Sequence, residues 1–266
     1  MNDGRIQIGM SSAVFYGYEE TENAAARLRE FGLDTCEIFL ETFSEYTADF
    51  GRVVREKLGG LSCASVHAKG TQFEPDLFGL SVRQQEDAFH LLDGVLAAGE
   101  AMGARYMVFH GPGNVRARRH PDSFPRLQPV FARMQETARK HGMEVLWENV
   151  SWCALSSPED IAQARQLLPE QGFVLDLKQA NRSGVDPFDV LAAMGDKLRH
   201  LHVLDWDDQG KLVLPGEGVM DFPRLAKRLR AMDWSGAVML EPYANESRDP
   251  QRLKQSLCYL REVFAG

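Results

Sequence analysis

The stretch FVLDLKQANRS, residues 173–183, decides the fold class that the sequence predicts. Its alternation predicts a buried strand with Val174, Asp176 and Lys178 on one face and large apolar residues on the other. A buried aspartate is costly unless a cation or several hydrogen-bond donors satisfy it. Asp176 therefore needs partners from elsewhere in the chain, and the ends of other predicted strands supply candidates.

Other apolar runs end in, or contain, residues that can bind a metal ion. The run SCASVH ends at His67, RYMVFH at His110, MEVLWE at Glu148 and AVMLE at Glu241, while HLHVLD contains His202. Their spacing is close to the length of one strand-plus-helix unit in a barrel of about 250 residues. The recurrence is the main signal in the chain.

Strand and helix patterns alternate through the whole sequence. We interpret them as eight strand–helix units, which predict an α/β fold, a parallel (β/α)8 barrel that forms one domain over residues 1–266. An open doubly wound sheet would require a glycine-rich phosphate-binding turn after the first strand. The segment IGMSSAVFYG has no GxGxxG motif, so the barrel is favoured.

Cap residues predict where several helices begin. Thr21 is expected to be the N-cap of the first helix, and Ser81 that of a long amphipathic helix that ends at residue 102. The sequence Ser157-Pro158-Glu159-Asp160 is typical of a helix start, as are the Asp-Pro pairs at Pro187 and Pro250.

The composition of the chain limits the classes of protein to which it can belong. Among 266 residues, 44% are hydrophobic and 26% charged, which is ordinary for a globular protein, and no apolar run approaches the ~20 residues of a membrane span. The N-terminal sequence has no signal-peptide pattern, so we expect a cytoplasmic protein. The four scattered cysteines predict reduced, mostly buried thiols. A net charge of −8 disfavours nucleic-acid binding.

The polar strand residues suggest metal chemistry. In a (β/α)8 barrel, catalytic groups stand at the C-terminal ends of the strands. A lone histidine or glutamate there is more often structural, but several on consecutive strands predict at least one bound divalent ion. The candidate ligands are His67, His110, Glu148, Asp176, His202 and Glu241.

The loop after His110 carries the one basic cluster of the sequence, Arg116, Arg118, Arg119 and His120. It is interpreted either as a solvated turn or as a contact for an anion or a partner at the barrel mouth.

The order of these residues, together with the segments ENV, HLHVLD and PGEGVMDF, resembles the xylose isomerase-like barrel superfamily. That group includes sugar isomerases and epimerases, inosose dehydratases and apurinic endonucleases of the endonuclease IV type. The resemblance implies that Glu148, Asp176, His202 and Glu241 hold one divalent ion. It implies Mn²⁺ first, with Mg²⁺, Co²⁺ or Zn²⁺ as alternatives.

The resemblance also concerns His67 and His110. They match positions that bind a second ion in the nuclease branch, bridged by the glutamate that matches Glu148. In this chain they are expected to bind either a second ion or substrate hydroxyl groups.

Three departures from the family pattern are visible. Gln179 stands where the family usually has the histidine of an Asp-x-x-His motif. Gly210 and Leu212 stand where the nuclease branch has Asp-x-His, so a third metal site cannot be built from them. The segment VLDWDDQGK lacks the arginine that sugar 3-epimerases place there.

A divalent ion that chelates two adjacent oxygens of a ketose or polyol stabilises an enediolate. Glu148 and Glu241 are the predicted catalytic pair, which removes a proton on one face and returns it on the other. Lys178 either stabilises an enediolate oxygen or binds a substrate carboxylate or phosphate. Alternatively, it forms a salt bridge to Asp176 or to a neighbouring glutamate. Gln179 is grouped with the substrate-binding candidates.

Aromatic residues near the strand ends are candidates for packing against the apolar face of a sugar ring, although some of them would be ordinary rim packing. They are Phe15, Tyr16, Phe39, Trp152 and Trp206.

The function expected from the sequence is a metal-dependent sugar isomerase or epimerase with a small-molecule substrate. A homo-oligomer is compatible with it. The alternatives are a dehydratase or lyase that acts on a polyhydroxylated ring, cleavage of an oxidised glycoside together with a partner subunit, and a non-catalytic binding subunit. An apurinic endonuclease-type phosphodiesterase is disfavoured by the incomplete third site and the negative charge.

Overall fold

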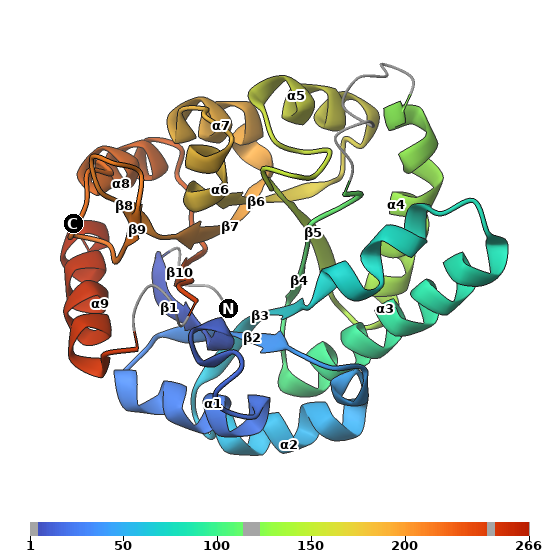
Figure 1. The fold of residues 1–266 in the computed structure, drawn as a ribbon, viewed down its shortest axis with the longest axis horizontal. Helices are drawn as coiled ribbons and strands as arrows, with labels where there is room; N and C mark the ends of the chain where they lie inside the picture. Colours follow the sequence, from blue (N-terminus) through green and yellow to red (C-terminus); the bar gives the residue numbers. More distant parts are fainter. Residues whose placement is uncertain (1–4, 114–122, 244–247, 266) are drawn as a thin grey trace.

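Eight parallel strands close into a barrel in the computed structural model of the chain, which describes residues 5–113, 123–243 and 248–265 (Figure 1). Around the barrel the strand order is β1-β10-β7-β6-β5-β4-β3-β2. The strands are β1 (Gln7–Ser11), β2 (Thr35–Leu40), β3 (Ser62–Ala68), β4 (Tyr106–Phe109), β5 (Glu144–Glu148), β6 (Gly172–Asp176), β7 (Leu198–Val203) and β10 (Ala237–Leu240). The predicted (β/α)8 barrel is confirmed.

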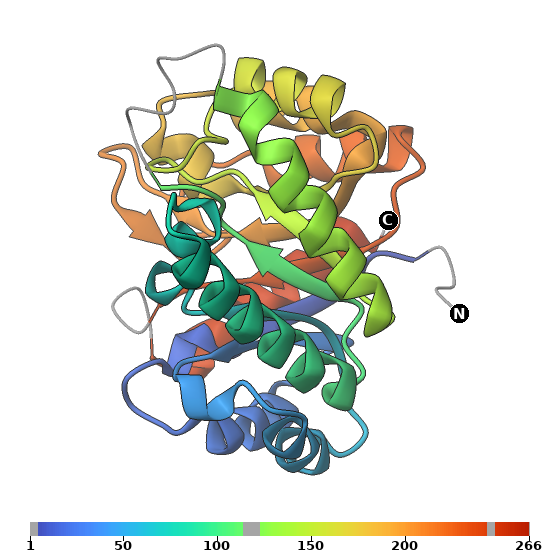
Figure 2. The same ribbon diagram turned by 90° about the vertical axis from the view of Figure 1, so that its right-hand side faces the viewer.

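Helices surround the strands, and Figure 2 shows the long helices α3 and α4 running side by side along one flank. Two helices, α6 and α7, fill the connection between β6 and β7. The helices are α1 (Thr21–Leu28), α2 (Ala48–Leu58), α3 (Val82–Met102), α4 (Ser123–Lys140), α5 (Pro158–Leu167), α6 (Leu177–Arg182), α7 (Pro187–Met194), α8 (Phe222–Ala231) and α9 (Pro250–Phe264). Among the described residues, no helix combines the length and apolarity that crossing a membrane requires.

Strand alternation separates two apolar layers. Val108, Leu146 and Val174 form a small buried cluster inside the barrel. Their outward-pointing neighbours belong to the main core between strands and helices, where the ring of Trp147 lies 4.4 Å from that of Phe131 on α4. Because successive side chains of a strand point to opposite faces, each strand can supply both the core and the barrel interior.

The predicted helix starts agree with the structure at several caps. Ser81 caps α3, and Ser157 forms a capping box with Asp160 at the start of α5. The expectation for Thr21 is wrong, since it is the first residue of α1 rather than the residue before it. Its hydroxyl instead donates a hydrogen bond to the Glu45 carboxylate at 3.1 Å.

Strand β6 is shorter than predicted. It ends at Asp176, whose Oδ1 accepts a hydrogen bond from the backbone N–H of Gln179 at 2.8 Å and so caps helix α6. An aspartate in this position is a favoured helix N-cap. Lys178 therefore lies in the first turn of a helix, and the prediction that it continues the strand is wrong.

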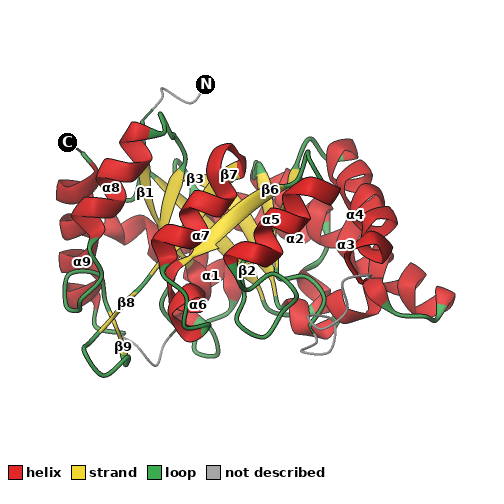
Figure 3. Cartoon of the chain, turned by 90° about the horizontal axis from the view of Figure 1, so that it is seen from above, coloured by secondary structure: helices red, strands yellow, loops and turns green. Residues whose placement is uncertain are grey.

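A small antiparallel hairpin, β8 (Asp205–Trp206) and β9 (Leu212–Val213), follows β7. Figure 3 shows it on the same side of the molecule as α6, where the strands end. The carboxylate of Asp205 accepts hydrogen bonds from the backbone N–H groups of Gly216, Gly218 and Met220 at 2.9–3.2 Å. These bonds hold the PGEG segment against the hairpin.

Candidate metal centre and active site

Four side chains meet at the C-terminal end of the barrel. Glu148 ends β5, Asp176 ends β6, His202 lies in β7 and Glu241 follows β10. Each offers one ligand atom, these atoms lie within 4.8 Å of one another, and all four residues are buried. Three carboxylates in such a small volume repel one another unless positive charge compensates them.

Asp176 shows most directly that a partner is needed. Its backbone is fixed by Asn149, which donates to its carbonyl at 2.9 Å and accepts from its N–H at 2.8 Å. Its Oδ2 atom is buried and accepts no hydrogen bond from any residue the structure describes. Burial raises the pKa of Asp176 to about 7. A buried oxygen that has no hydrogen bond among the described residues, and only a 3.6 Å ion pair with Lys178 to offset two neighbouring carboxylates, suits a cation.

The ring of His202 presents its two nitrogens to different carboxylates. Nδ1 lies 3.0 Å from Glu148 Oε1 and 3.5 Å from Glu241 Oε2, while Nε2 lies 3.1 Å from Glu37 Oε2. Burial opposes protonation, but the negative charges of Glu37 and Glu241 raise the pKa of His202 well above its usual value. Burial would raise the pKa of Glu148, yet hydrogen bonds with His202 and His67 hold it well below its usual value.

Lys178 is a buried cation beside the four candidate ligands. Its Nζ lies 3.0 Å from Glu241 Oε2 and 3.6 Å from Asp176 Oδ2, and 4.9 Å from the centre of the Tyr243 ring. Although burial opposes the charge, Glu241 and Asp176 raise the pKa of Lys178 well above its ordinary value. Of the alternatives the sequence left open, the structure contains the salt bridge.

His67 and His110 form a second group with the same glutamate. Their Nε2 atoms lie 3.7 and 3.5 Å from Glu148 Oε2, and their rings are 4.6 Å apart. The other nitrogen of His67 faces the carbonyl of Ala68 at 2.8 Å, and that of His110 faces Glu74 Oε2 at 3.4 Å. Despite burial, Glu148 raises the pKa of His67 to about 9. Glu148 thus belongs to two candidate ligand groups.

Gln179 is directed toward the β5 loop. Its Oε1 accepts hydrogen bonds from the backbone N–H and the hydroxyl of Ser151 at 3.2 and 3.0 Å. The amide therefore braces the loop after Glu148.

The predicted aromatic residues separate into two sets. Phe39 is buried with its ring 5.4 Å from His67 and 5.5 Å from Tyr16, and Trp152 is 42% exposed beside His110, 5.7 Å between rings. The structure does not bring Phe15 to this set, since it packs against Phe31 in the core. Trp206 also packs against the core, from the hairpin. The basic cluster of Arg116, Arg118, Arg119 and His120 lies outside the described residues.

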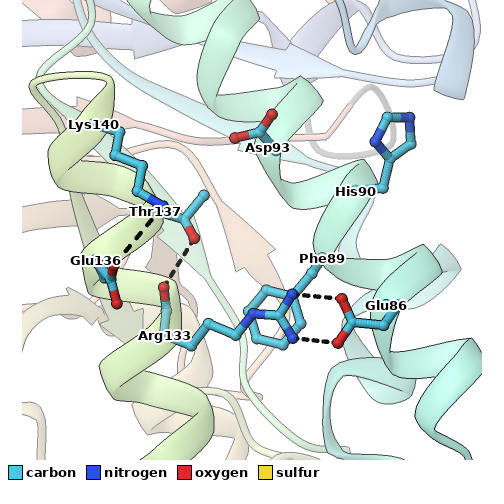
Figure 4. Close-up of a pocket in the computed structure, with 8 residues that line it drawn as sticks. All are labelled: Glu86, Phe89, His90, Asp93, Arg133, Glu136, Thr137 and Lys140. Carbon is cyan, nitrogen blue, oxygen red and sulfur yellow. Dashed lines mark hydrogen bonds and ion pairs between the residues drawn. The ribbon is translucent and has the colours of Figure 1, made fainter.

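A different hollow, of about 510 Å³, lies on the flank between α3 and α4 (Figure 4). Arg133 spans it, with two hydrogen bonds of 2.6 Å to Glu86 and its guanidinium over the ring of Phe89. Exposed ion pairs of this kind contribute little to stability. None of the candidate site residues lines this hollow.

The sequence matches the family described as xylose isomerase-like TIM barrel over residues 25–263. The chain belongs to this family. No curated protein that was compared matches it.

Solved structures share the xylose isomerase-like fold over nearly the whole chain. The 3-keto-D-glucoside 4-epimerase from E. coli is 18% identical, with a TM-score of 0.75 over 97% of this chain and 100% of that one. A D-psicose 3-epimerase is 14% identical, with a TM-score of 0.79 over 98% and 100%. A probable 3-DHS dehydratase from Bacillus anthracis is 13% identical, with a TM-score of 0.73 over 98% and 99%. At these identities the likeness concerns the fold alone.

The donor atoms of this xylose isomerase-like chain fit a divalent ion. Carboxylate oxygens and one imidazole nitrogen are ligands of hard or borderline cations. The buried Asp176 Oδ2 has no hydrogen bond among the described residues and lies 3.6 Å from Lys178 Nζ, so such an ion would give it a closer partner.

Several residues of the site were not among the sequence candidates. Glu37, Ser65 and His200 lie beneath the four candidate ligands, and Glu74 supports His110. Glu37 could have been recognised as a carboxylate inside the apolar strand run TCEIFL. Burying a charge there is energetically costly. Glu74 begins a short 3-10 helix, Glu74–Phe78, in the connection between β3 and α3, where no periodic sequence pattern identifies it.

Proposed function

We propose that this chain is a divalent-metal-dependent sugar isomerase or epimerase. It moves a proton at a carbon of a ketose or related polyol. The observation that supports this proposal is the convergence of four buried ligand atoms within 4.8 Å of one another, from Glu148, Asp176, His202 and Glu241. A merely structural network would be expected to satisfy each buried oxygen with a protein donor, whereas Asp176 Oδ2 has no hydrogen bond among the described residues.

When bound, a divalent ion would act as a Lewis acid toward two adjacent oxygens of the substrate. The four residues of the proposal would hold it, and Mn²⁺ is the ion we propose first, ahead of Mg²⁺, Co²⁺ and Zn²⁺. His67 and His110 would bind substrate hydroxyls or a second ion beside Glu148. A cytoplasmic location and a homo-oligomeric state stay predictions.

Glu148 and Glu241 are the proposed proton-transferring pair. They stand at the ends of β5 and β10, and β6 and β7 separate these strands in the barrel. The two carboxylates therefore approach the site from different sides, as removal and return of a proton on opposite faces requires. Lys178 would orient Glu241 through its 3.0 Å contact.

Two aromatic residues are suited to the substrate's apolar face. Phe39 lies against His67, and the partly exposed Trp152 lies against His110. Aromatic rings of this kind provide apolar contact area at ligand sites.

The proposal is tested by proton exchange in heavy water. The metal-loaded enzyme would be incubated with a panel of ketoses, inososes and keto-glycosides, and deuterium uptake would be followed by mass spectrometry. We expect uptake with at least one ketose, and its loss in both Glu148→Gln and Glu241→Gln. Glu144→Gln, at the start of β5, is the matched control and should retain it. Retained exchange in both site variants would refute the assignment.

A dehydratase is the second candidate. It is supported by the likeness of the fold to the probable 3-DHS dehydratase, and removal of a proton beside a carbonyl also begins the loss of water from a polyhydroxylated ring. The same substrate panel separates the two functions, because dehydration produces a conjugated product that absorbs ultraviolet light and epimerisation does not.

A further inference from the structure

A second buried polar group lies beneath the four candidate metal ligands. It consists of Glu37 on β2, Ser65 on β3 and His200 on β7, and each of these residues is fully buried at 0% exposure. Glu37 Oε2 accepts a hydrogen bond from the Ser65 hydroxyl at 2.8 Å and lies 3.5 Å from His200 Nε2. The same oxygen lies 3.1 Å from Nε2 of His202. The carboxylate thus connects this lower group to the proposed metal site.

Burial makes this carboxylate costly, so its position requires an explanation. A charged group taken out of water needs hydrogen-bond partners to offset its desolvation. The hydroxyl of Ser65 donates to Glu37 from the neighbouring strand, and the two residues are also paired in the β2–β3 register. The contact with His202 crosses the barrel, since β2 and β7 are not adjacent strands. An apolar residue would fill the position at lower cost if packing were its whole role.

The ring of His202 explains what the carboxylate can do. Its Nδ1 is the nitrogen directed toward Glu148 and Glu241, at 3.0 and 3.5 Å. An imidazole can bind a cation through Nδ1 when the ring proton is on Nε2, and the hydrogen bond made by the second nitrogen decides which tautomer is present. Glu37 is placed to accept that hydrogen bond.

We infer that Glu37 is a positioning residue, which fixes the orientation and tautomer of His202 so that Nδ1 is available to a divalent cation. Ser65 supports it by holding the same carboxylate oxygen. The inference rests on the proposed metal-dependent function. It adds a residue on β2 that contacts neither the substrate nor the ion.

The test measures metal affinity and tautomer rather than turnover. Mn²⁺ binding would be measured by isothermal titration calorimetry in the wild type, Glu37→Gln and Glu144→Gln. Outer-shell partners of a ligand histidine typically contribute about 10–100-fold in metal affinity. We expect Glu37→Gln to weaken Mn²⁺ binding within that range, and Glu144→Gln, a matched change on β5, to leave it within about twofold.

Nitrogen-15 NMR of the Zn²⁺-loaded protein gives an independent measurement. The His202 signal is identified by its absence in His202→Gln. We expect a proton on Nε2 and none on Nδ1 in the wild type, and a shifted Nε2–H signal in Glu37→Gln. A proton on Nδ1 in the loaded wild type would overturn the inference.

The outcomes separate the inference from the function on which it rests. A wild type that binds no divalent ion would overturn both. A wild type that binds Mn²⁺, with unchanged affinity in a folded Glu37→Gln variant, would overturn the positioning role alone. If Glu37→Gln does not fold, Ser65→Ala tests the positioning role instead, because it removes one hydrogen bond to the Glu37 carboxylate and leaves its charge in place. We expect it to weaken Mn²⁺ binding several-fold, and unchanged binding would contradict the role.

Discussion

The ammonium of Lys178 lies 3.0 Å from Glu241 Oε2, so one positive charge of the protein itself already faces the cluster of carboxylates. Both groups are buried, at 3% side-chain exposure each. The salt bridge offsets part of the repulsion among the three carboxylates, and it gives the metal-free protein a way to keep them together.

We predict that Lys178→Met destabilises the metal-free protein. Removing one partner of a buried ion pair typically costs about 3–5 kcal/mol, because the other charge stays buried without its counter-ion. Urea unfolding should show a loss of that order, and Mn²⁺ should restore more stability to the variant than it adds to the wild type. Lys140→Met, at an exposed lysine of α4, is the control. Equal unfolding free energies for wild type and Lys178→Met would contradict the prediction.

Asp176→Asn should separate metal binding from folding. The amide can still cap α6 through its oxygen. The change removes the 3.6 Å ion pair with Lys178, but Lys178 keeps its closer partner Glu241, and the repulsion of a buried charge at Asp176 by Glu148 and Glu241 disappears. We therefore expect no loss of stability in the metal-free protein. Mn²⁺ affinity, measured by titration calorimetry, should fall by more than the ~10–100-fold typical of an outer-shell partner. Unchanged affinity would remove Asp176 from the proposed ligands.

The pH dependence of the unfolding free energy should show the contribution of the His141 charge. His141 follows α4 and contacts two carboxylates of α3. Its ring nitrogens lie 2.8 Å from Glu100 and 3.1 Å from Asp93. Partial burial opposes the charge, but these two carboxylates raise the pKa of His141 above its ordinary value. A raised folded-state pKa means that the stabilisation is fully present below the unfolded pKa of about 6.5 and is lost as pH rises through the folded pKa.

His141→Gln should therefore lower the unfolding free energy more at pH 6 than at pH 9, as measured in urea. The double variant Asp93→Asn/Glu100→Gln should show the same pH dependence of its loss, because it removes the other side of the contact. A loss from His141→Gln that is the same at both pH values would show that the charge of His141 has no part in it.

The contact between α2 and α3 depends on Gly51. A Cβ atom there would lie 2.4 Å from the carbonyl oxygen of Ala98, which is too close. We predict that Gly51→Ala lowers the unfolding free energy by about 1–3 kcal/mol, as overpacking does, although alanine is the better helix former. Gly60→Ala meets open space and should be neutral or slightly stabilising. Matching melting temperatures for the two variants would argue against close packing here.

The sequence was sufficient to predict the barrel and to place polar residues near the C-terminal ends of its strands, although not to predict that β6 ends at Asp176. Glu148 and Asp176 each end an apolar run, and parallel strands of a closed barrel bring such ends together without further information. Lys178 could not be placed correctly, because an aspartate that ends a strand and one that caps a helix look the same within an alternating pattern. The structure distinguishes them by the bond from the Gln179 N–H to Asp176.

The contact between Glu37 and His202 is harder to predict from a single sequence. It joins β2 to β7 across the interior of the barrel, between residues 165 positions apart. Strand alternation predicts that both side chains point inward, but the stagger between distant strands decides whether they meet. That stagger depends on the closure of the sheet and on the register shift between Cys36 and Glu37.

Glu148 presents Oε1 to His202 and Oε2 to the pair His67 and His110. A single carboxylate thus faces two neighbouring candidate positions for a cation. Ions would not bind independently at the two positions. An ion at one position would change the electron density and the orientation of the Glu148 carboxylate that the other ion binds. Loading would proceed in two steps of unequal affinity, and a stoichiometry measured at one ion concentration would not describe both.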